Sequence, residues 1–368
     1  MILNPDSAPL TRDIADYPEG IIIPIDKPYR WTSADVIRKI KYAAIRHFGK
    51  KNLKVGHAGT LDPLATGVLL VCIGKATKLA EELQSHDKEY VAGVTFGATT
   101  PSYDLEKEID RFFPHEHISA EAVSEALPEF LGEQDQVAPL FSAKSVDGVR
   151  AYELARKLYK ANSGSDSGDP RLSEDSHPLA EGGMSPTSHS TIGSVQSSDL
   201  DTAAEQLLRV SRINITELEL LSFTMGLALG ESGFENRATP LAAGVVSDKT
   251  NSPADFCNEQ PAVAGMVGTH EVGGVVFKTA SPEAESTNSA SSRINVTDNS
   301  ALGLPRAEIR MACSKGTYVR AFARDLGEAL GSGAHLDSLQ RSRSGQFRVE
   351  NALTVEQALQ KLQGVFHN

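Results

Sequence analysis

The hydrophobic positions of the chain alternate with polar ones in some stretches and recur every three or four residues in others, so the sequence predicts both strands and helices. Alternation is clear in KEYVAGVTFGATT, where Tyr90, Ala92, Val94 and Phe96 share one face of a strand. The run GIIIPID predicts another strand, and LLVCIG predicts a buried one. Two later alternating runs, LLRVSRINITELELLSF and PRAEIRMACSKG, predict strands that pair as a hairpin.

Helical spacing occurs between and after these strands. One helix is expected to begin near Thr32 or Ser33, either of which can accept a backbone N–H as a cap, and another after Ser119. The runs KATKLAEEL and AYELARKLYK are also predicted helices, and GTYVRAFARDLGEAL begins a further one. In this last helix one face carries Val319, Phe322, Ala323 and Leu326. We therefore predict an α+β fold around a twisted, mainly antiparallel sheet with flanking helices.

Two long segments interrupt this pattern. Residues 161–206 are dominated by Ser, Gly, Asp and Pro, and residues 225–300 are rich in Ala, Gly, Ser and Glu. Acidic segments of low hydrophobicity cannot offset the entropy of ordering, so we predict that both are disordered insertions. The rest of the chain is predicted to form a loosely ordered N-terminal arm (1–20) and one domain assembled from residues 21–160, 207–224 and 301–368.

The charge of the whole chain argues at first against a nucleic acid partner. The net charge is −12, whereas contacts to phosphates need Lys and Arg. The two insertions carry −7 and −5, which is the whole of this imbalance, and residues 301–348 carry +4. A neutral body with a basic C-terminal part can bind RNA through a local patch.

The cysteines, the histidines and the lengths of the apolar runs bear on the cellular compartment and on whether a metal site is expected. Cys72, Cys257 and Cys313 lie far apart without a CxxC motif, which favours a reducing cytoplasm and no zinc site. His115 and His117 stand in a Pro-His loop that lacks the helical spacing of metal ligands, so no metal site is predicted. The sequence has neither an apolar run of about eighteen residues nor a basic segment followed by an apolar one at its start. We expect neither a membrane span nor a signal peptide.

One run, GHAGTLDPLATGVLLVCIGKATKLAEEL (Gly56–Leu83), concentrates the candidate chemistry. Its first half is too rich in Gly, Pro and small residues for a helix or a strand, so we predict a loop that presents side chains beside rigid elements. Pro63 fixes the residue after Asp62 and so places this carboxylate on a constrained turn. Asp-Pro is a common turn dipeptide, but Asp62 shares the loop with His57 and almost no other polar side chain. This pairing favours a reactive carboxylate.

The motifs GHAGTLDPLATGVLLV, GKATK, KEYVAGVTFGATT and CSKGTYVRAFARDLG follow one another along the chain, and together they closely resemble the TruB family of tRNA pseudouridine synthases. The resemblance covers residues 20–160, 207–224 and about 304–355. It implies the pseudouridine synthase fold and an isomerase that converts uridine 55 of the tRNA T loop to pseudouridine. The partner implied is the T arm of tRNA, bound by a cytoplasmic monomer that needs no cofactor and no obligatory protein partner. A C-terminal RNA-binding module of the PUA type is not expected.

Matching positions imply the roles of individual residues. Asp62 corresponds to the catalytic aspartate, Tyr90 to the ring that stacks on the base, and Arg320 to the ion-pair partner of the aspartate. His57 matches a histidine near the flipped nucleotide, and Leu339 matches an apolar wall of the pocket. A carboxylate beside Arg stays ionised when it is desolvated, and so remains available as a nucleophile or a base. Attack on the sugar, attack on the base and removal of a ribose proton all stay open as the role of Asp62.

Basic side chains outside this set are candidate RNA contacts. Lys144 and Arg150 belong to a basic stretch that resembles the start of the family's thumb, which closes over the T loop. Arg341 and Arg343 are expected to lie in a basic loop around Gly345 that is suited to phosphates. Lys27 stands in a turn where the resemblance favours a structural role. The first insertion lies at the thumb and is expected to affect RNA capture, whereas the second extends a hairpin tip and is expected to matter less.

Two other classes of function are weighed against this one. An RNA-binding or tRNA-folding protein without catalysis would not need the carboxylate of the set Asp62, Tyr90 and Arg320. A hydrolase that used His57 and Asp62 would need a nucleophile or a set of metal ligands, and the sequence offers neither.

Overall fold

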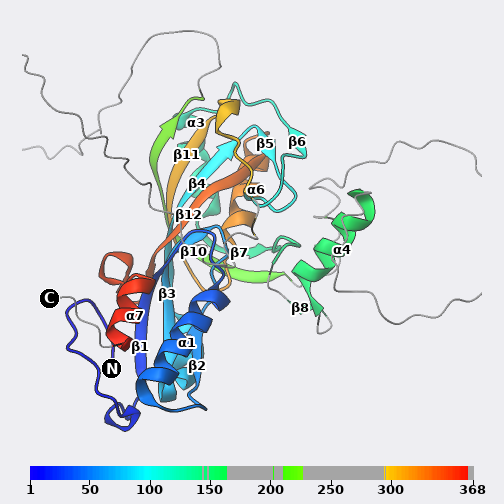
Figure 1. The fold of residues 1–368 in the computed structure, drawn as a ribbon. Coiled ribbons are helices and arrows are strands. Elements are labelled where there is room, and N and C mark those ends of the chain that lie inside the picture. The colour runs from blue at the N-terminus through cyan, green and yellow to red at the C-terminus, as the bar shows by residue number, and fades with distance from the viewer. Residues whose placement is uncertain are drawn as a thin grey trace, which may run out of the picture. The chain divides into compact units, whose positions relative to one another are not determined.

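The fold of the protein, seen in a computed structural model, is built on a sheet of nine strands (Figure 1). The structure describes residues 1–142, 145–146, 149–163, 202, 210–226, 294 and 296–363. The predicted disorder of residues 161–206 and 225–300 concerns residues that lie for the most part outside this description. The sequence-based division of the chain into domains stays a prediction.

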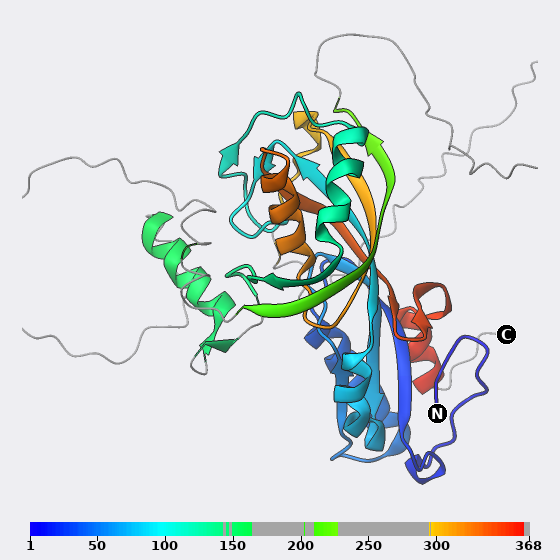
Figure 2. The same cartoon turned by 180° about the vertical axis from the view of Figure 1, so that it is seen from behind.

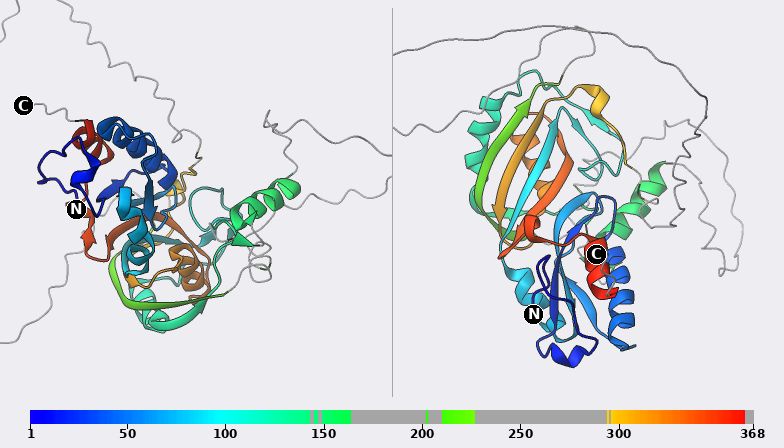
Figure 3. Two further views of the ribbon diagram at one scale, coloured as in Figure 1. Left: turned by 90° about the horizontal axis from the view of Figure 1, so that it is seen from below. Right: turned by 60° about the vertical axis from the view of Figure 1, so that its left-hand side comes forward.

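The strands of the sheet run in the order β1-β3-β12-β4-β11-β10-β7, with β2 paired to β3 and β13 paired to β12. Every pairing is antiparallel except that of β3 with β12, which is parallel. The α+β class and the mainly antiparallel sheet expected from the sequence are thus confirmed. In the right-hand view of Figure 3, β10, β11, β4 and β12 lie side by side. The strands are β1 (Ile21–Lys27), β2 (Val55–Ala58), β3 (Ala65–Ile73), β4 (Lys88–Phe96), β5 (Ala98–Thr99), β6 (Arg111–Phe112), β7 (Gly132–Gln136), β8 (Ser145–Val146), β9 (Val149–Arg150), β10 (Ser211–Thr224), β11 (Arg306–Cys313), β12 (Ala334–Ser344) and β13 (Phe347–Arg348).

Helices cover the sheet in two groups. Helix α6 packs on β12 and β4, and α3 packs on β10 (Figure 2). The ring of Phe130, just after α3, meets that of Phe322 in α6 edge to face, with centroids 5.4 Å apart. Helices α1 and α7 contact one another, and α7 also packs on β1. The α-helices are α1 (Ser33–Phe48), α2 (Ala80–Ser85), α3 (Ala120–Ala126), α4 (Ala151–Ser163), α6 (Val319–Ala329) and α7 (Val355–Gln363). Short 3-10 helices are η1 (Ile14–Asp16), η2 (Gly74–Leu79), η3 (Leu127–Phe130), η5 (Ser300–Leu302) and η6 (Val349–Asn351).

The predicted helix starts are confirmed by their caps. The Thr32 side chain accepts a hydrogen bond from the backbone N–H of Asp35, and the Asp35 carboxylate accepts one from the backbone N–H of Thr32, which makes a capping box for α1. Ser119 caps α3 by accepting from Ala122 N–H. In α6, the predicted apolar face is buried in the core: Val319, Phe322, Ala323 and Leu326.

Two predictions about the run from Gly56 to Leu83 were wrong in part. Its first residues belong to strand β2, which pairs with β3 so that His57 faces Val71, and the loop covers only residues 59–64. The backbone hydrogen bonds of this pairing outweigh a local composition that disfavours a strand. The predicted helix KATKLAEEL begins instead as the 3-10 helix η2 and continues as α2.

The other late elements agree with the sequence. Strands β10 and β11 pair as the predicted antiparallel hairpin. A short antiparallel pair of strands, β8 and β9, precedes α4, which the sequence predicted as a helix. Within the described part of the chain, no helix combines the length and the apolar character needed to cross a membrane.

Candidate active site

The loop that carries Asp62 is held by three buried polar side chains. The ammonium of Lys27 donates to the carbonyl of Pro63 at 3.2 Å. The hydroxyl of Ser33 accepts from Leu61 N–H at 3.0 Å and donates to the carbonyl of the same residue at 3.1 Å. The guanidinium of Arg341 donates to the carbonyls of Gly59, Thr60 and Val68. A loop whose carbonyls are fixed in this way holds its side chains in place for chemistry.

The parallel pairing of β3 with β12 requires a glycine at position 67. Gly67 lies opposite Arg341 in the register and has a φ of 96°. A Cβ at this position would lie 2.2 Å from the carbonyl oxygen of Arg341, so no other residue fits. The amide of Gly67 also donates to the carboxylate of Asp26 at 3.0 Å. This close approach brings β12, with Leu339 and Arg341, against the end of the Asp62 loop.

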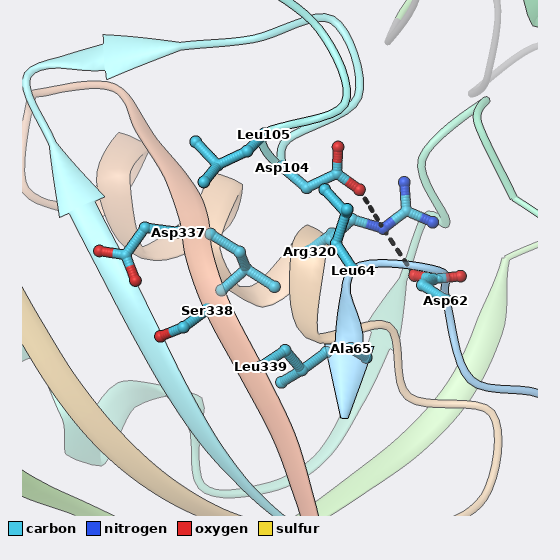
Figure 4. Close-up of a pocket in the computed structure, with 10 residues that line it drawn as sticks. Asp62, Leu64, Ala65, Asp104, Leu105, Arg320, Asp337, Ser338 and Leu339 are labelled. Carbon is cyan, nitrogen blue, oxygen red and sulfur yellow. Dashed lines mark hydrogen bonds and ion pairs between the residues drawn. The ribbon is translucent and has the colours of Figure 1, made fainter. Parts of the chain in front are cut away.

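The predicted ion pair between Asp62 and Arg320 is present (Figure 4). The Nε of Arg320 donates to Oδ2 of Asp62 at 2.9 Å, although 258 residues separate the two in sequence. The Asp62 side chain is 40% exposed, whereas that of Arg320 is only 6% exposed. The carboxylate is therefore open to a substrate, while the cation that pairs with it is shielded from water.

Arg320 is held by more than Asp62. Its Nε lies 3.7 Å from Oδ2 of Asp104, and its two terminal nitrogens donate to the carbonyls of Ser102 (3.0 Å) and Phe141 (2.8 Å). Burial by itself would lower the pKa of Arg320, but the nearby carboxylates, with Asp62 first among them, raise it. The guanidinium thus stays charged and in one orientation.

Asp104 is a site residue that the sequence analysis missed. Its carboxylate accepts from the Ser102 hydroxyl at 2.6 Å and from the Glu106 amide at 2.9 Å. Burial raises the pKa of this carboxyl, while Arg320 opposes the rise. The preceding residue, Tyr103, has a φ of 55°, an uncommon backbone conformation for a side chain of this size. An acidic residue in the polar loop after the Tyr90 strand was the only signal, and polar loops hold many such residues.

Tyr90 and Leu339 lie in one wall of a cavity beside Asp62. The cavity has a volume of about 370 Å³, and Arg341 and Arg320 also line it. Tyr90 is buried in β4 opposite Arg341 of β12, and burial raises the pKa of its hydroxyl. Leu339 is partly buried and lies opposite both Ala92 of β4 and Ala65 of β3. The two residues expected to contact a base therefore line one cavity together with Asp62.

His57 lines a second cavity, of about 600 Å³, on which Asp62 and Arg320 also border. Its Nδ1 is buried and has no hydrogen-bond partner among the described residues. Burial lowers the pKa of the imidazole, and the charge of Arg341 lowers it further, so the ring is neutral at pH 7. Asp62 thus stands between two cavities, one with Tyr90 and one with His57.

Two of the five expected RNA contacts are corrected by burial. Lys27 and Arg341 are 0% and 1% exposed, and their donors are turned to backbone carbonyls of the Asp62 loop, so neither is available to a phosphate. Arg343 stays partly exposed, with its Nε 3.6 Å from the Glu89 carboxylate. Lys144 and the side chain of Arg150 lie outside the described residues.

The structure brings no metal-binding group together in the part of the chain that it describes: no three His, Cys, Asp or Glu side chains are grouped as ligands. Burial raises the pKa of the Cys72 and Cys313 thiols to about 11, which makes them poor nucleophiles. Cys257 is outside the description. The Nε2–H of His117 donates to the carbonyl of Leu330 at 2.8 Å, which fits a structural role in its loop.

Two family models match the segments of the chain that carry Asp62 and Arg320. Residues 46–165 match the model of the TruB family pseudouridylate synthase (N terminal domain), which spans the Asp62 loop and Tyr90. Residues 320–366 match the tRNA pseudouridylate synthase B C-terminal domain, which begins at Arg320. Among solved structures, the crystal structure of a Cbf5-Nop10-Gar1 complex aligns with a TM-score of 0.45 and 19% identity over 99% of this chain and 63% of that one.

Curated relatives are similar over nearly the whole chain. The tRNA pseudouridine synthase B of Phocaeicola vulgatus is 37% identical over 341 residues, which is 93% of this chain and 92% of the relative. The enzyme of the same name from Bacteroides thetaiotaomicron is 36% identical over 341 residues, again 93% and 92%. On this similarity along its length, the chain belongs to the TruB family of pseudouridylate synthases.

Proposed function

We propose that this protein is a tRNA pseudouridine synthase that isomerises uridine 55 of the T loop. The observation that carries the proposal is the Asp62 carboxylate, paired at 2.9 Å with a buried arginine and open to two cavities. Family membership supports the reaction, and curated relatives that carry this activity in their names align over 93% of the chain. We also propose that the protein acts as a monomer in the cytoplasm.

The target uridine leaves the base stack before it reacts. Flipping a base costs a few kcal/mol, which stacking on an aromatic ring and filling of a shaped pocket offset. We assign the uracil to the cavity of Tyr90 and Leu339, where an aromatic ring and an apolar side chain flank the carboxylate. We assign His57 to the neighbouring part of the T loop, because its neutral ring faces the second cavity.

The reaction breaks the bond between N1 of uracil and C1′ of ribose, turns the base, and forms a bond from C5 to C1′. N1 gains a proton and C5 loses one, so the product is an isomer and no oxidant, reductant or group donor is consumed. Asp62 is the residue we assign to this exchange, as a nucleophile on the sugar, a nucleophile on the base, or a base toward a ribose proton. Arg320 holds the carboxylate in place beside the cavity through the hydrogen bond from its Nε.

The test uses the proton that C5 loses. Purified protein is incubated with a T-arm stem-loop whose uridine carries tritium at C5, and tritium release is measured for the wild type, Asp62→Asn, and Asp16→Asn as a control. Asp16 lies exposed in the N-terminal arm and loses the same charge. We expect release from the wild type and the control, and none from Asp62→Asn, with RNA binding unchanged. If Asp62→Asn turns over as the wild type does, the assignment is wrong. If even the wild type releases nothing while it binds RNA, the protein is an RNA-binding protein.

A further inference from the structure

Residues near the C-terminal end of the second insertion lie against the active site. The hairpin of β10 and β11 is already closed at Gly226 and Gly303, since a Cβ built on Gly226 would fall 1.5 Å from the carbonyl oxygen of Gly303. The residues before Gly303 therefore add to a hairpin that is complete without them. We use the term return segment for residue 294 and residues 296–299.

The return segment makes contacts with three elements that build the site. The amide of Thr297 donates to the carbonyl of Leu105 at 2.9 Å, directly after Asp104. A terminal nitrogen of Arg30 donates to the carbonyl of Ile294 at 2.7 Å, in the turn between Lys27 and α1. The side chain of Asn299 lies 3.4 Å from Nε2 of His335, in β12. The segment thus lies against the frame that holds Asp62 and Arg320.

Ile294 contributes a side chain to the site itself. It lines the cavity of about 600 Å³ that Asp62, His57 and Arg320 also line, and it is partly exposed there. An isoleucine in such a wall offers apolar contact to the face or edge of a base, and a partly exposed apolar side chain gains free energy when a ligand covers it.

Arg30 is constrained to hold this position. Its φ is 63°, a left-handed conformation that is unfavourable for a residue with a Cβ. Such conformations persist where the surrounding structure fixes them, and the bond to the carbonyl of Ile294 is one of the contacts that does so. The turn and the return segment therefore support one another.

We propose that Ile294 contacts the RNA substrate and adds to its affinity, and that Arg30 positions it. The inference rests on the proposed function, because it takes the ligand of this cavity to be the T loop. It assigns the second insertion a part in substrate binding, although its place at a hairpin tip suggested a lesser one.

The first experiment measures kcat and KM for the T-arm stem-loop by tritium release. Ile294→Ala is compared with Leu302→Ala, which shortens another apolar side chain of the same stretch, one that is 46% exposed and does not line the cavity. We expect Ile294→Ala to raise KM roughly three- to tenfold with kcat within about twofold, the pattern of lost ground-state binding. Leu302→Ala should match the wild type, and neither change should lower the melting temperature. An unchanged KM in Ile294→Ala, or a lower kcat together with a lower melting temperature, would overturn the proposal.

The second experiment asks whether Arg30 acts through Ile294. Arg30→Ala should raise KM by about the same factor, and the double variant should be no worse than Ile294→Ala alone, because coupled residues are not additive. If the two factors multiply, Arg30 contacts RNA independently and its positioning role is wrong. A wild type that releases no tritium overturns the proposed function, and this inference with it. An active wild type with an equally active Ile294→Ala overturns only the inference.

Discussion

Two arginines of this protein face carboxylates in very different surroundings. Arg320 is 6% exposed, and its guanidinium is engaged by Asp62, by Asp104 and by two carbonyls. Arg310, in β11, is 36% exposed and pairs with Glu219 at 2.6 Å and Glu217 at 3.3 Å across β10. By distance alone the second cluster has the shorter ion pair.

The two clusters differ far more in burial than in the length of their ion pairs. Charges that remain in water gain little from pairing, about 0–1 kcal/mol, because solvent already stabilises each of them. A buried cation is costly unless its partners stay in place, so removing one member leaves a large penalty. In the Asp62 cluster this penalty fixes the geometry, while the exposed side of Asp62 remains free for substrate.

The largest effect is expected from Arg320→Met, which keeps the volume of the side chain but removes its charge. Asp104 then stays buried without a cation, so the free energy of unfolding should fall by about 3–5 kcal/mol. Since Asp62 also loses its partner, kcat/KM should fall on the order of 10²-fold or more. Urea denaturation and tritium release measure the two effects. A variant that keeps more than a tenth of the wild-type kcat/KM would contradict the role given to this pair.

Asp104→Asn sharpens the comparison, because it removes one carboxylate from the buried cluster and leaves the Asp62 pair intact. We expect kcat to fall about ten- to a hundredfold, the equivalent of roughly 1–3 kcal/mol in the positioning of Arg320. KM should change little, since Asp104 is 7% exposed and its carboxylate faces Arg320. Comparable falls in kcat and in RNA affinity would instead mean that Asp104 itself meets the RNA.

Asp104→Asn is also expected to change how the stability of the protein depends on pH. Burial raises the pKa of Asp104 above its value in the unfolded chain, so the folded protein holds this proton more tightly. Stability contributed by the carboxyl is therefore present at low pH and is lost as pH rises through the folded pKa. Denaturation at several pH values should show this loss in the wild type and not in Asp104→Asn. Parallel pH curves for the two proteins would contradict it.

Lys27 extends the comparison to a buried cation that donates only to carbonyls. Burial lowers its pKa from 10.5 to about 8, although Asp62 and Asp26 oppose the shift. The unfolded chain thus binds more protons between pH 8 and 10.5, and wild-type stability should rise over this range by an amount on the order of 1–3 kcal/mol. Lys27→Met should be less stable at pH 8, because three carbonyls lose their donor, and should lack this rise. Equal slopes in denaturation between pH 8 and 10 would rule out Lys27 as the group that titrates.

The sequence predicted the Asp62 cluster in part, and the reasons for the rest are physical. Asp62 stood out as a carboxylate that shares a loop of small residues with His57, and the family resemblance implied Arg320 as its ion-pair partner. Asp104 did not stand out, because its role arises from a contact with Arg320 that sequence spacing does not encode. Arg341 was taken as an exposed cation, whereas the resemblance favoured a structural role for Lys27, and the fold shows that both are buried and hold the Asp62 loop.

Strands such as β4 and β11 and most helices were predictable because their periodicity repeats over many residues. Strand β12 was not: the stretch that holds Arg341 and Arg343 was predicted as a basic loop, which was wrong. Strand β2 was missed because Gly56 and Ala58 have little strand preference of their own and are held by pairing with β3. The return segment was beyond prediction for a similar reason: the contact of Ile294 with Arg30 joins residues 264 positions apart within a stretch that has no periodic pattern.

The smallest effect is expected from Arg310→Met, the counterpart of Arg320→Met on the exposed face of the sheet. Glu217 and Glu219 remain solvated when the guanidinium is lost. The buried carboxylate of Glu89, 3.8 Å from Arg310, keeps Arg343 as a partner at 3.6 Å. Stability should therefore change by less than about 1 kcal/mol, and by less still in 1 M salt, where exposed charges are screened. Tritium release should equal that of the wild type. Because the two variants remove the same group from pairs of similar length, any difference between them measures what burial adds. If Arg310→Met lost as much stability as Arg320→Met, ion-pair geometry and not burial would set the energy of both clusters.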